Sequence, residues 1–234
     1  MTRGVRMKRI NLFLIAVALM CAVSFSISTV EANGQLDEIL ANMQKAAQNI
    51  RSVSADLKAE KRFTGSIGGR EVNSGKLWFK HEGKGSDKVK VEYLQNGSPN
   101  QVVWVVGNEI WFWQRSINQV ILTTRSSQAS KNQEFSFIAT PYTSVPELKS
   151  QYNIVHKGDE GSSAVLELTP KRASSVKQLT LWVDKSLWVP NRYQVIEKNG
   201  DVSTFVLSNM RLNDAISPAM FKKSWPSGTK ELRK

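Results

Sequence analysis

Two neighbouring stretches of the chain, residues 102–106 and 110–113, carry an apolar side chain at every position. Gly107 and Asn108 lie between them, and such a pair favours a tight turn between two strands. Side chains along a strand point alternately to the two faces of its sheet, so these strands are apolar on both faces. The chain must therefore fold into a sheet that is covered on both sides at this point.

Short extended runs separated by turn residues fill most of the chain. Further turn signals are Gly68-Gly69, residues 83–87, residues 96–100 and Asn199-Gly200. The runs are residues 53–63, 76–80, 88–94, 101–106, 109–115, 119–124, 164–169, 177–184, 192–198 and 202–212. About ten strands with too little helix for crossovers predict a curved antiparallel sheet, an incomplete barrel in a mostly β, α+β fold. A sheet of that size leaves room for an apolar cavity.

A helix is expected before the first strand. Apolar residues recur there at spacings of three and four, which is the stripe of an amphipathic helix; they are Leu36, Ile39, Leu40, Met43, Ala46, Ala47 and Ile50. The period changes to two from Val53 onward, so a strand should follow the helix directly.

The N-terminus has the layout of a secretory signal peptide. Four basic residues precede an apolar run from Leu12 to Val23, and Val30 and Ala32 supply small residues at a cleavage site. We expect a cleaved signal over residues 1–32, export to the periplasm, and a single domain over residues 33–234. An uncleaved signal anchor is the alternative. The only cysteine, Cys21, lies within the signal, so the mature chain would hold no thiol.

Charge and motifs argue against nucleic-acid binding and catalysis. The 32 Lys and Arg residues outnumber 20 Asp and Glu, but they are dispersed along the strands, with no groove-reading motif. Attraction to anionic lipid head groups is the functional alternative to a solvated basic surface. The two histidines, His81 and His156, match no metal-binding pattern, and both are expected at turns or strand ends. We predict no enzyme activity, cofactor or metal; a glycosidase carboxylate pair is the enzyme alternative.

The apolar strands suggest residues that line a cavity, with an ordinary filled core as the alternative. The candidates are Leu77, Phe79, Trp104, Phe112, Leu166, Leu168, Leu181 and Phe205. The segment 126–150 interrupts the strands and carries Phe135 and Phe137, which are candidates for a lid. Seven tryptophans are also typical of sugar-binding modules, but their position within apolar runs favours burial.

The chain resembles the LolA-type periplasmic carriers of outer-membrane lipoproteins. The resemblance begins with the signal peptide and helix and continues through residues 52–63 and 75–79. It is most specific over residues 99–120, which look like the family's central hairpin, and it ends with residues 166–170, 179–184, Pro190, Ile216, Phe221, Pro226 and Gly228.

The resemblance implies a carrier, or chaperone, that holds acyl chains of lipoproteins in a half-barrel and catalyses no reaction. Its partners would be acylated lipoproteins or other lipid cargo, an inner-membrane lipoprotein-releasing transporter and an outer-membrane acceptor, with the carrier acting as a monomer. The family's strand arginine, which holds the lid closed, corresponds to Lys90 here, and lysine lacks the planar fork of arginine. The alternative is a non-catalytic envelope module on the same fold that binds another lipid, a glycan or a signalling partner.

Overall fold

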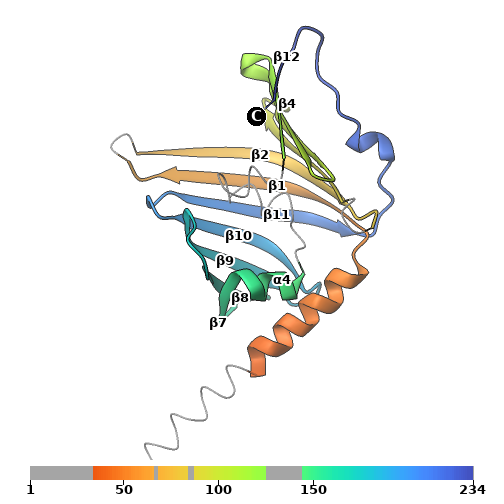
Figure 1. Cartoon of the computed structure of the whole chain (residues 1–234). Helices are drawn as coiled ribbons and strands as arrows, with labels where there is room; N and C mark the ends of the chain where they lie inside the picture. The colour runs from red at the N-terminus through yellow and green to blue at the C-terminus, as the bar shows by residue number, and fades with distance from the viewer. Residues whose placement is uncertain (1–33, 66–67, 84–86, 125–143, 234) are drawn as a thin grey trace, which may run out of the picture.

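The computed structural model describes residues 34–65, 68–83, 87–124 and 144–233. The predicted signal peptide and the lid candidates Phe135 and Phe137 lie outside these residues. A helix at 34–49 opens the described chain and leads directly into the first strand, as the change of sequence period predicted (Figure 1). Among the described residues, no helix has the length and apolar character needed to cross a membrane.

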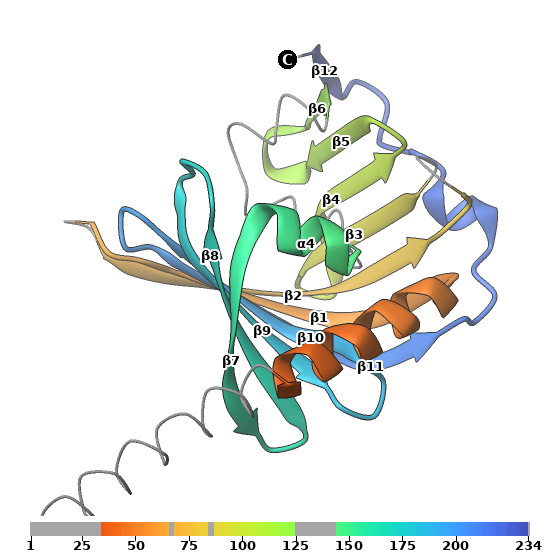
Figure 2. The ribbon, with the colours of Figure 1, turned by 60° about the horizontal axis from the view of Figure 1, so that its bottom comes forward.

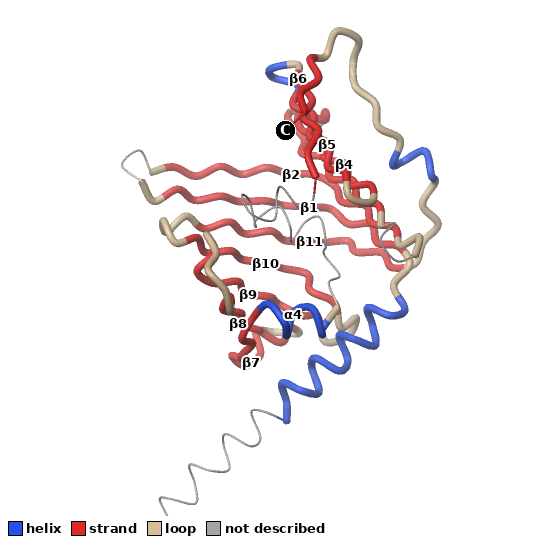
Figure 3. Tube along the Cα trace, viewed as in Figure 1, coloured by secondary structure: helices blue, strands red, loops and turns tan. Residues whose placement is uncertain are grey.

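The described residues form twelve strands. Figure 3 shows that strands make up most of the described chain. Their bounds are β1 Ser52–Phe63, β2 Gly69–Lys80, β3 Lys88–Gln95, β4 Ser98–Val106, β5 Glu109–Gln114, β6 Gln119–Thr124, β7 Tyr152–Glu160, β8 Ser163–Pro170, β9 Val176–Asp184, β10 Val189–Glu197, β11 Val202–Leu212 and β12 Lys230–Arg233. The remaining elements are the helix α4, Val145–Gln151, and the 3₁₀ turns η1, Arg115–Ile117, and η2, Pro218–Phe221.

All twelve strands belong to one sheet, in the order β12-β6-β5-β4-β3-β2-β1-β11-β10-β9-β8-β7. Strands β1 to β6 pair antiparallel in chain order, and so do β7 to β11; β1 joins the two series by pairing antiparallel with β11. Only β12, which lies parallel to β6, departs from this pattern. The sheet is strongly curved and open, because β12 and β7 form its two ends (Figure 2). The predicted incomplete barrel is confirmed.

Alternation along the strands gives the sheet two chemically different faces. Side chains such as Ala55 and Leu77 join one large buried cluster with residues of the helix 34–49 and of α4. We call this side the inner face and the opposite side the outer face. Both helices lie over the inner face (Figure 2). Their apolar residues Leu40 and Leu148 are buried there, which explains the helical stripe of the sequence.

The outer face of β4, β5 and β6 has a separate apolar cluster. Val102, Trp104, Trp113 and Val120 are buried there, and Trp225 packs against them. Trp225 belongs to the segment 213–229, which connects β11 to β12; its ring stacks on Trp111 at 5.4 Å and meets Trp104 edge-on at 6.2 Å. Residues 102–106 and 110–113 are therefore covered on both faces, as predicted. The inner cluster packs on one face, and Trp225 of the segment 213–229 packs on the other.

Two expectations about strands need correction. The sequence pattern predicts about ten strands, and the structure adds β7 and β12; β7 follows the irregular segment 126–150 and β12 has only four residues, so neither has a clear local signal. His156 was expected at a turn or strand end. It lies within β7 instead, and its side chain is only 6% exposed.

Two backbone features shape the centre of the sheet. A Cβ on Gly75 would lie 2.0 Å from the backbone oxygen of Glu92, so only glycine permits the close approach of β2 and β3. On β11, the residues Asn209 and Met210 oppose the single residue Ala55 of β1, which is a β-bulge. Asn209 adopts a left-handed conformation there, with φ of 50°.

Candidate functional site

The inner face gathers most of the residues predicted to line a cavity. Six of the predicted residues are buried in the inner cluster, namely Leu77, Phe79, Leu166, Leu168, Leu181 and Phe205. Phe112 is half-buried and packs against the same cluster. These residues come from β2 and β5 on one side of β1 and from β11, β9 and β8 on the other, so the sheet curvature brings together side chains that are far apart in sequence.

Strand register explains this gathering. Leu166 of β8 lies directly opposite Leu181 of β9, and Leu168 lies opposite Leu179. Directly paired residues share a face of the sheet and contact each other. The same period of two identifies inner-face residues that the sequence reading left out, namely Val89, Val91, Val103, Val105, Leu179 and Val195. The alternation of residues along each strand already divides them into two sets, but only the pairing between strands shows which set faces inward.

One end of the inner face carries polar groups. Lys61, two residues beyond the buried Ala59, forms an ion pair of 3.4 Å with Glu197 and lies 5.5 Å from the ring centre of Phe63. Ser203, opposite both Lys61 and Val195, is 1% exposed, and its hydroxyl has no hydrogen-bond partner among the described residues. The apolar surface therefore ends at a polar rim.

Titratable groups of the inner cluster are held uncharged. Burial raises the pKa of the Tyr193 phenol well above its ordinary value, and the Tyr193 hydroxyl donates to the backbone oxygen of Pro190 at 3.4 Å. Burial also raises the pKa of Tyr152. A phenol that stays protonated cannot act as a base at neutral pH. These residues therefore contribute apolar surface and hydrogen bonds rather than charge.

His156 does not form the centre of a reactive site. It lies opposite Leu166 on β7, and its Nε2 is 3.4 Å from Asp159 Oδ1, without the geometry of a hydrogen bond. Asp159 is engaged by Lys185, whose ammonium hydrogen bond is the main reason that the pKa of Asp159 is lowered. In the described part of the chain, no three His, Cys, Asp or Glu side chains are grouped so that they would hold a metal.

Two of the predicted cavity residues lie on the outer face and are separated from the others by the sheet. Trp104 belongs to the cluster beneath Trp225. Lys90 lies directly between Trp78 and Trp104 across the strands, with its ammonium 5.5 Å and 5.9 Å from their ring centres. It also pairs with Glu92 at 2.7 Å and contacts the sulfur of Met220 at 3.9 Å. Lys90 thus connects the sheet to the segment 213–229.

Comparison with protein families gives a match over residues 61–224 to the family described as outer membrane lipoprotein carrier protein LolA. Comparison of the sequence with curated proteins gives no match.

Solved structures with a similar arrangement of strands share little sequence with the chain. An uncharacterized conserved protein from Thermus thermophilus is 14% identical, with a TM-score of 0.54 over 86% of this chain and 99% of that one. A structure of MucB is 15% identical, with a TM-score of 0.52 over 82% of this chain and 63% of MucB. Lipoprotein LppX from Mycobacterium tuberculosis is 14% identical, with a TM-score of 0.46 over 77% and 98%. The first two likenesses show a shared fold.

Proposed function

The chain belongs to the LolA family of outer membrane lipoprotein carrier proteins, and on that premise we propose that it carries lipoproteins by holding their acyl chains against the inner face of the sheet. The observation that supports this most strongly is the continuous apolar surface of the inner face, which extends from β8 across β1 to β5. Over this surface, the described residues supply only two helices, 34–49 and α4.

Transfer of acyl chains from water to this face would drive binding. Each buried methylene contributes about 0.8 kcal/mol, so an acyl chain of ordinary length gives ample affinity without specific polar contacts. The uncharged state of Tyr152 and Tyr193 suits this role, because a charge next to an acyl chain would remain desolvated and unpaired. The polar rim at Lys61 and Glu197 is suited to the linkage between acyl chains and the protein part of the cargo.

The remaining parts of the proposal concern location and partners. The chain acts in the periplasm after cleavage near residue 32, as one non-catalytic domain over residues 33–234. An inner-membrane transporter supplies the cargo and an outer-membrane acceptor removes it. After removal of residues 1–32, 28 basic residues remain against 19 acidic ones, and this excess favours approach to anionic membrane surfaces.

A transfer assay with two matched variants tests the proposal. Purified protein is incubated with inner-membrane vesicles that contain a triacylated lipoprotein and the releasing transporter, and the soluble lipoprotein is measured. Phe112→Glu places a charge on the inner face at a half-buried position, whereas Val206→Glu places the same charge on the outer face, at a site that is 36% exposed. We expect release to fall about tenfold or more with Phe112→Glu, since a charge opposes acyl burial, and to change little with Val206→Glu. Equal release by both variants would contradict the proposal.

A further inference from the structure

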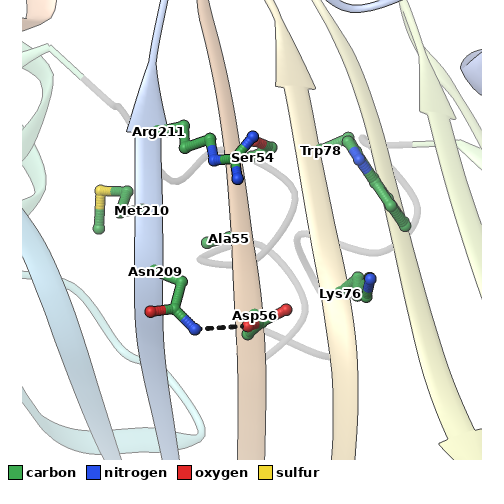
Figure 4. A pocket seen from close by; sticks show the side chains of 8 residues that line it. All are labelled: Ser54, Ala55, Asp56, Lys76, Trp78, Asn209, Met210 and Arg211. Atoms are coloured by element: carbon green, nitrogen blue, oxygen red, sulfur yellow. Dashed lines mark hydrogen bonds between the residues drawn. The ribbon is translucent and has the colours of Figure 1, made fainter. Parts of the chain in front are cut away.

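The outer face has a polar pocket of its own. It has a volume of about 590 Å³ and lies over β11, β1 and β2 (Figure 4). Its lining residues are Ser54, Ala55, Asp56, Lys76, Trp78, Asn209, Met210 and Arg211. The inner-face residue Leu77 lies between Lys76 and Trp78 in sequence, so these two side chains point away from the acyl-binding side. Of the lining residues, Ala55 and Met210 pack in or against the inner cluster, whereas the polar side chains and Trp78 lie on the outer face, so the pocket faces away from the inner face.

Strand register and the bulge of β11 build the pocket. Ser54 lies opposite Trp78 on one side and Arg211 on the other, and Asp56 lies opposite Lys76. The bulge inserts Asn209, whose side-chain amide donates to Asp56 Oδ2 at 2.8 Å (Figure 4). Bulges of this kind redirect side chains and recur next to functional sites. The carboxylate and the amide are thus held in a fixed arrangement at the pocket.

The two cations of the pocket have little compensation. Lys76 lies opposite Asp56 on β1 and Glu92 on β3, but in the described part of the chain it forms no ion pair with either, and Arg211 reaches Asp214 only at 3.9 Å, with 74% of its side chain exposed. Asp56 is the single acidic residue of the lining, so the pocket has a net positive charge. An anionic group can bind to these side chains with charge-assisted hydrogen bonds.

Trp78 gives the pocket a flat apolar wall. Lys90 lies 5.5 Å from the centre of its ring, which orients the indole by a cation–π contact. Trp104 and Trp111, farther along the same face, are covered by Trp225, but Trp78 borders the pocket. An aromatic wall beside a carboxylate, an amide and a hydroxyl is the combination that binds a sugar ring.

From these features we propose that the outer-face pocket binds an acidic saccharide. The sugar ring stacks on Trp78, its hydroxyl groups bond with Asp56 and Asn209, and its carboxylate or phosphate binds Lys76 and Arg211. This inference goes beyond acyl carriage, because it assigns a polar ligand to the opposite face of the sheet.

Titration of the full mature protein by NMR tests the assignment with three probes: glucuronic acid, glucose and inorganic phosphate. We expect saturable shifts with glucuronic acid at millimolar concentration, weaker binding of glucose, and weaker binding of phosphate. Lys76→Gln and Arg211→Gln should each weaken glucuronic acid binding about tenfold or more, as expected for the loss of one charged hydrogen bond, and should leave glucose binding nearly unchanged. Trp78→Ala should weaken the binding of both sugars.

Controls separate this proposal from folding and from acyl carriage. Arg172→Gln removes a cation from an exposed turn outside the pocket and should change nothing. Trp78→Phe keeps an aromatic wall and should retain most of the sugar binding. If inorganic phosphate binds as tightly as glucuronic acid, the sugar ring adds nothing to binding. The pocket would then be a simple anion site, and the saccharide assignment would be wrong. Absence of saturable binding, or full binding by Lys76→Gln and Arg211→Gln, would also overturn it. Lipoprotein release, measured in parallel, should not change in these variants.

Discussion

The inner and outer faces of the sheet are made by the same strands but are stabilised in different ways. The inner face is a continuous aliphatic surface in which Leu166, Leu168 and Leu179 are fully buried. The outer face alternates cations with aromatic rings, as in the row Trp78, Lys90 and Trp104, and it is covered locally by the segment 213–229. A continuous apolar surface can accommodate cargo of variable shape, whereas a row of charged and aromatic groups specifies particular contacts. Under the two proposals made above, the inner face stores acyl cargo and the outer face recognises a polar ligand.

The largest effect should come from deleting a fully buried inner side chain. Leu166→Ala removes a side chain that is 0% exposed and leaves a cavity, so the free energy of unfolding should fall by about 2–5 kcal/mol. Val206→Ala, at a position on the outer face that is 36% exposed, should change it by less than about 0.5 kcal/mol. Urea denaturation of both variants measures the difference. If both variants lose a similar amount of unfolding free energy, side chains on the two faces do not differ in how deeply they are buried.

An intermediate effect is expected when the cover of the outer face is removed. Trp225→Ala eliminates the stacked contact with Trp111 and the edge contact with Trp104, which exposes apolar surface beneath it. We expect a loss of about 2 kcal/mol, from roughly 0.5–1.5 kcal/mol for each aromatic pair. Lys222→Ala in the same segment is the control. If Trp225→Ala unfolds at the same urea concentration as the wild type, the segment 213–229 does not stabilise the outer face.

A smaller effect should follow from neutralising Lys90. Lys90→Met keeps the length of the side chain but removes the pair with Glu92 and the contacts with two indole rings. The side chains of Lys90 and Glu92 are only 14% and 18% exposed, so we expect a loss of about 1–2 kcal/mol. Lys90→Arg should retain most of the stability. Because Lys90 lies on the outer face, acyl binding should be unchanged in Lys90→Met; a loss of acyl binding would show that the two faces are coupled.

The smallest effect concerns acid stability at the turn between β9 and β10. The Asp184 carboxylate accepts hydrogen bonds from the backbone N–H groups of Ser186 and Leu187 and from the Ser186 hydroxyl. Burial alone would raise the pKa of Asp184, but these hydrogen bonds outweigh burial and lower it. Because the folded pKa is lowered, the stabilisation is fully present above the ordinary aspartate pKa of about 3.9 and is lost as the pH falls through the folded value.

Asp184→Asn should therefore reduce the pH dependence of unfolding in the acid range. We expect it to cost less than about 1 kcal/mol at neutral pH, since solvent screens this partly exposed site. Urea denaturation between roughly pH 2 and pH 7 measures the slope. Asp37→Asn, which alters a carboxylate that is 74% exposed, is the control. If the unfolding free energy of Asp184→Asn depends on pH in the acid range as that of the wild type does, Asp184 does not contribute to acid stability.

The sequence predicted the architecture better than the placement of single residues. Alternation and turn pairs such as Gly107-Asn108 were sufficient for ten of the twelve strands, because both signals are local. The strand β12 has four residues and depends on pairing with β6, so no local pattern marked it. Trp104 was grouped with inner residues because a strand that is apolar on both faces gives no parity, and Lys90 was included because it corresponds to the family's strand arginine. Their separation became visible only in the register, which depends on contacts between distant segments.

The outer-face pocket was beyond sequence reasoning for a similar reason. Asp56 and Lys76 are ordinary polar residues of alternating strands, and Asn209 is separated from them by more than a hundred positions. The bulge that brings Asn209 to Asp56 arises where β11 meets β1. Its sequence signal is weak, since Asn209 is only one of several asparagines with a left-handed conformation.

Photo-crosslinking with a fatty acid that carries a diazirine near its methyl end tests most directly whether acyl chains bind to the inner face of the sheet. After irradiation with the mature protein, mass spectrometry of the peptides locates the labelled residues. We predict that the labels fall on inner-face residues, including Phe112, Leu181 and Phe205, and are displaced by an acylated lipoprotein. Labels confined to the outer face, or labels that the lipoprotein does not displace, would contradict the assignment of acyl chains to the inner face.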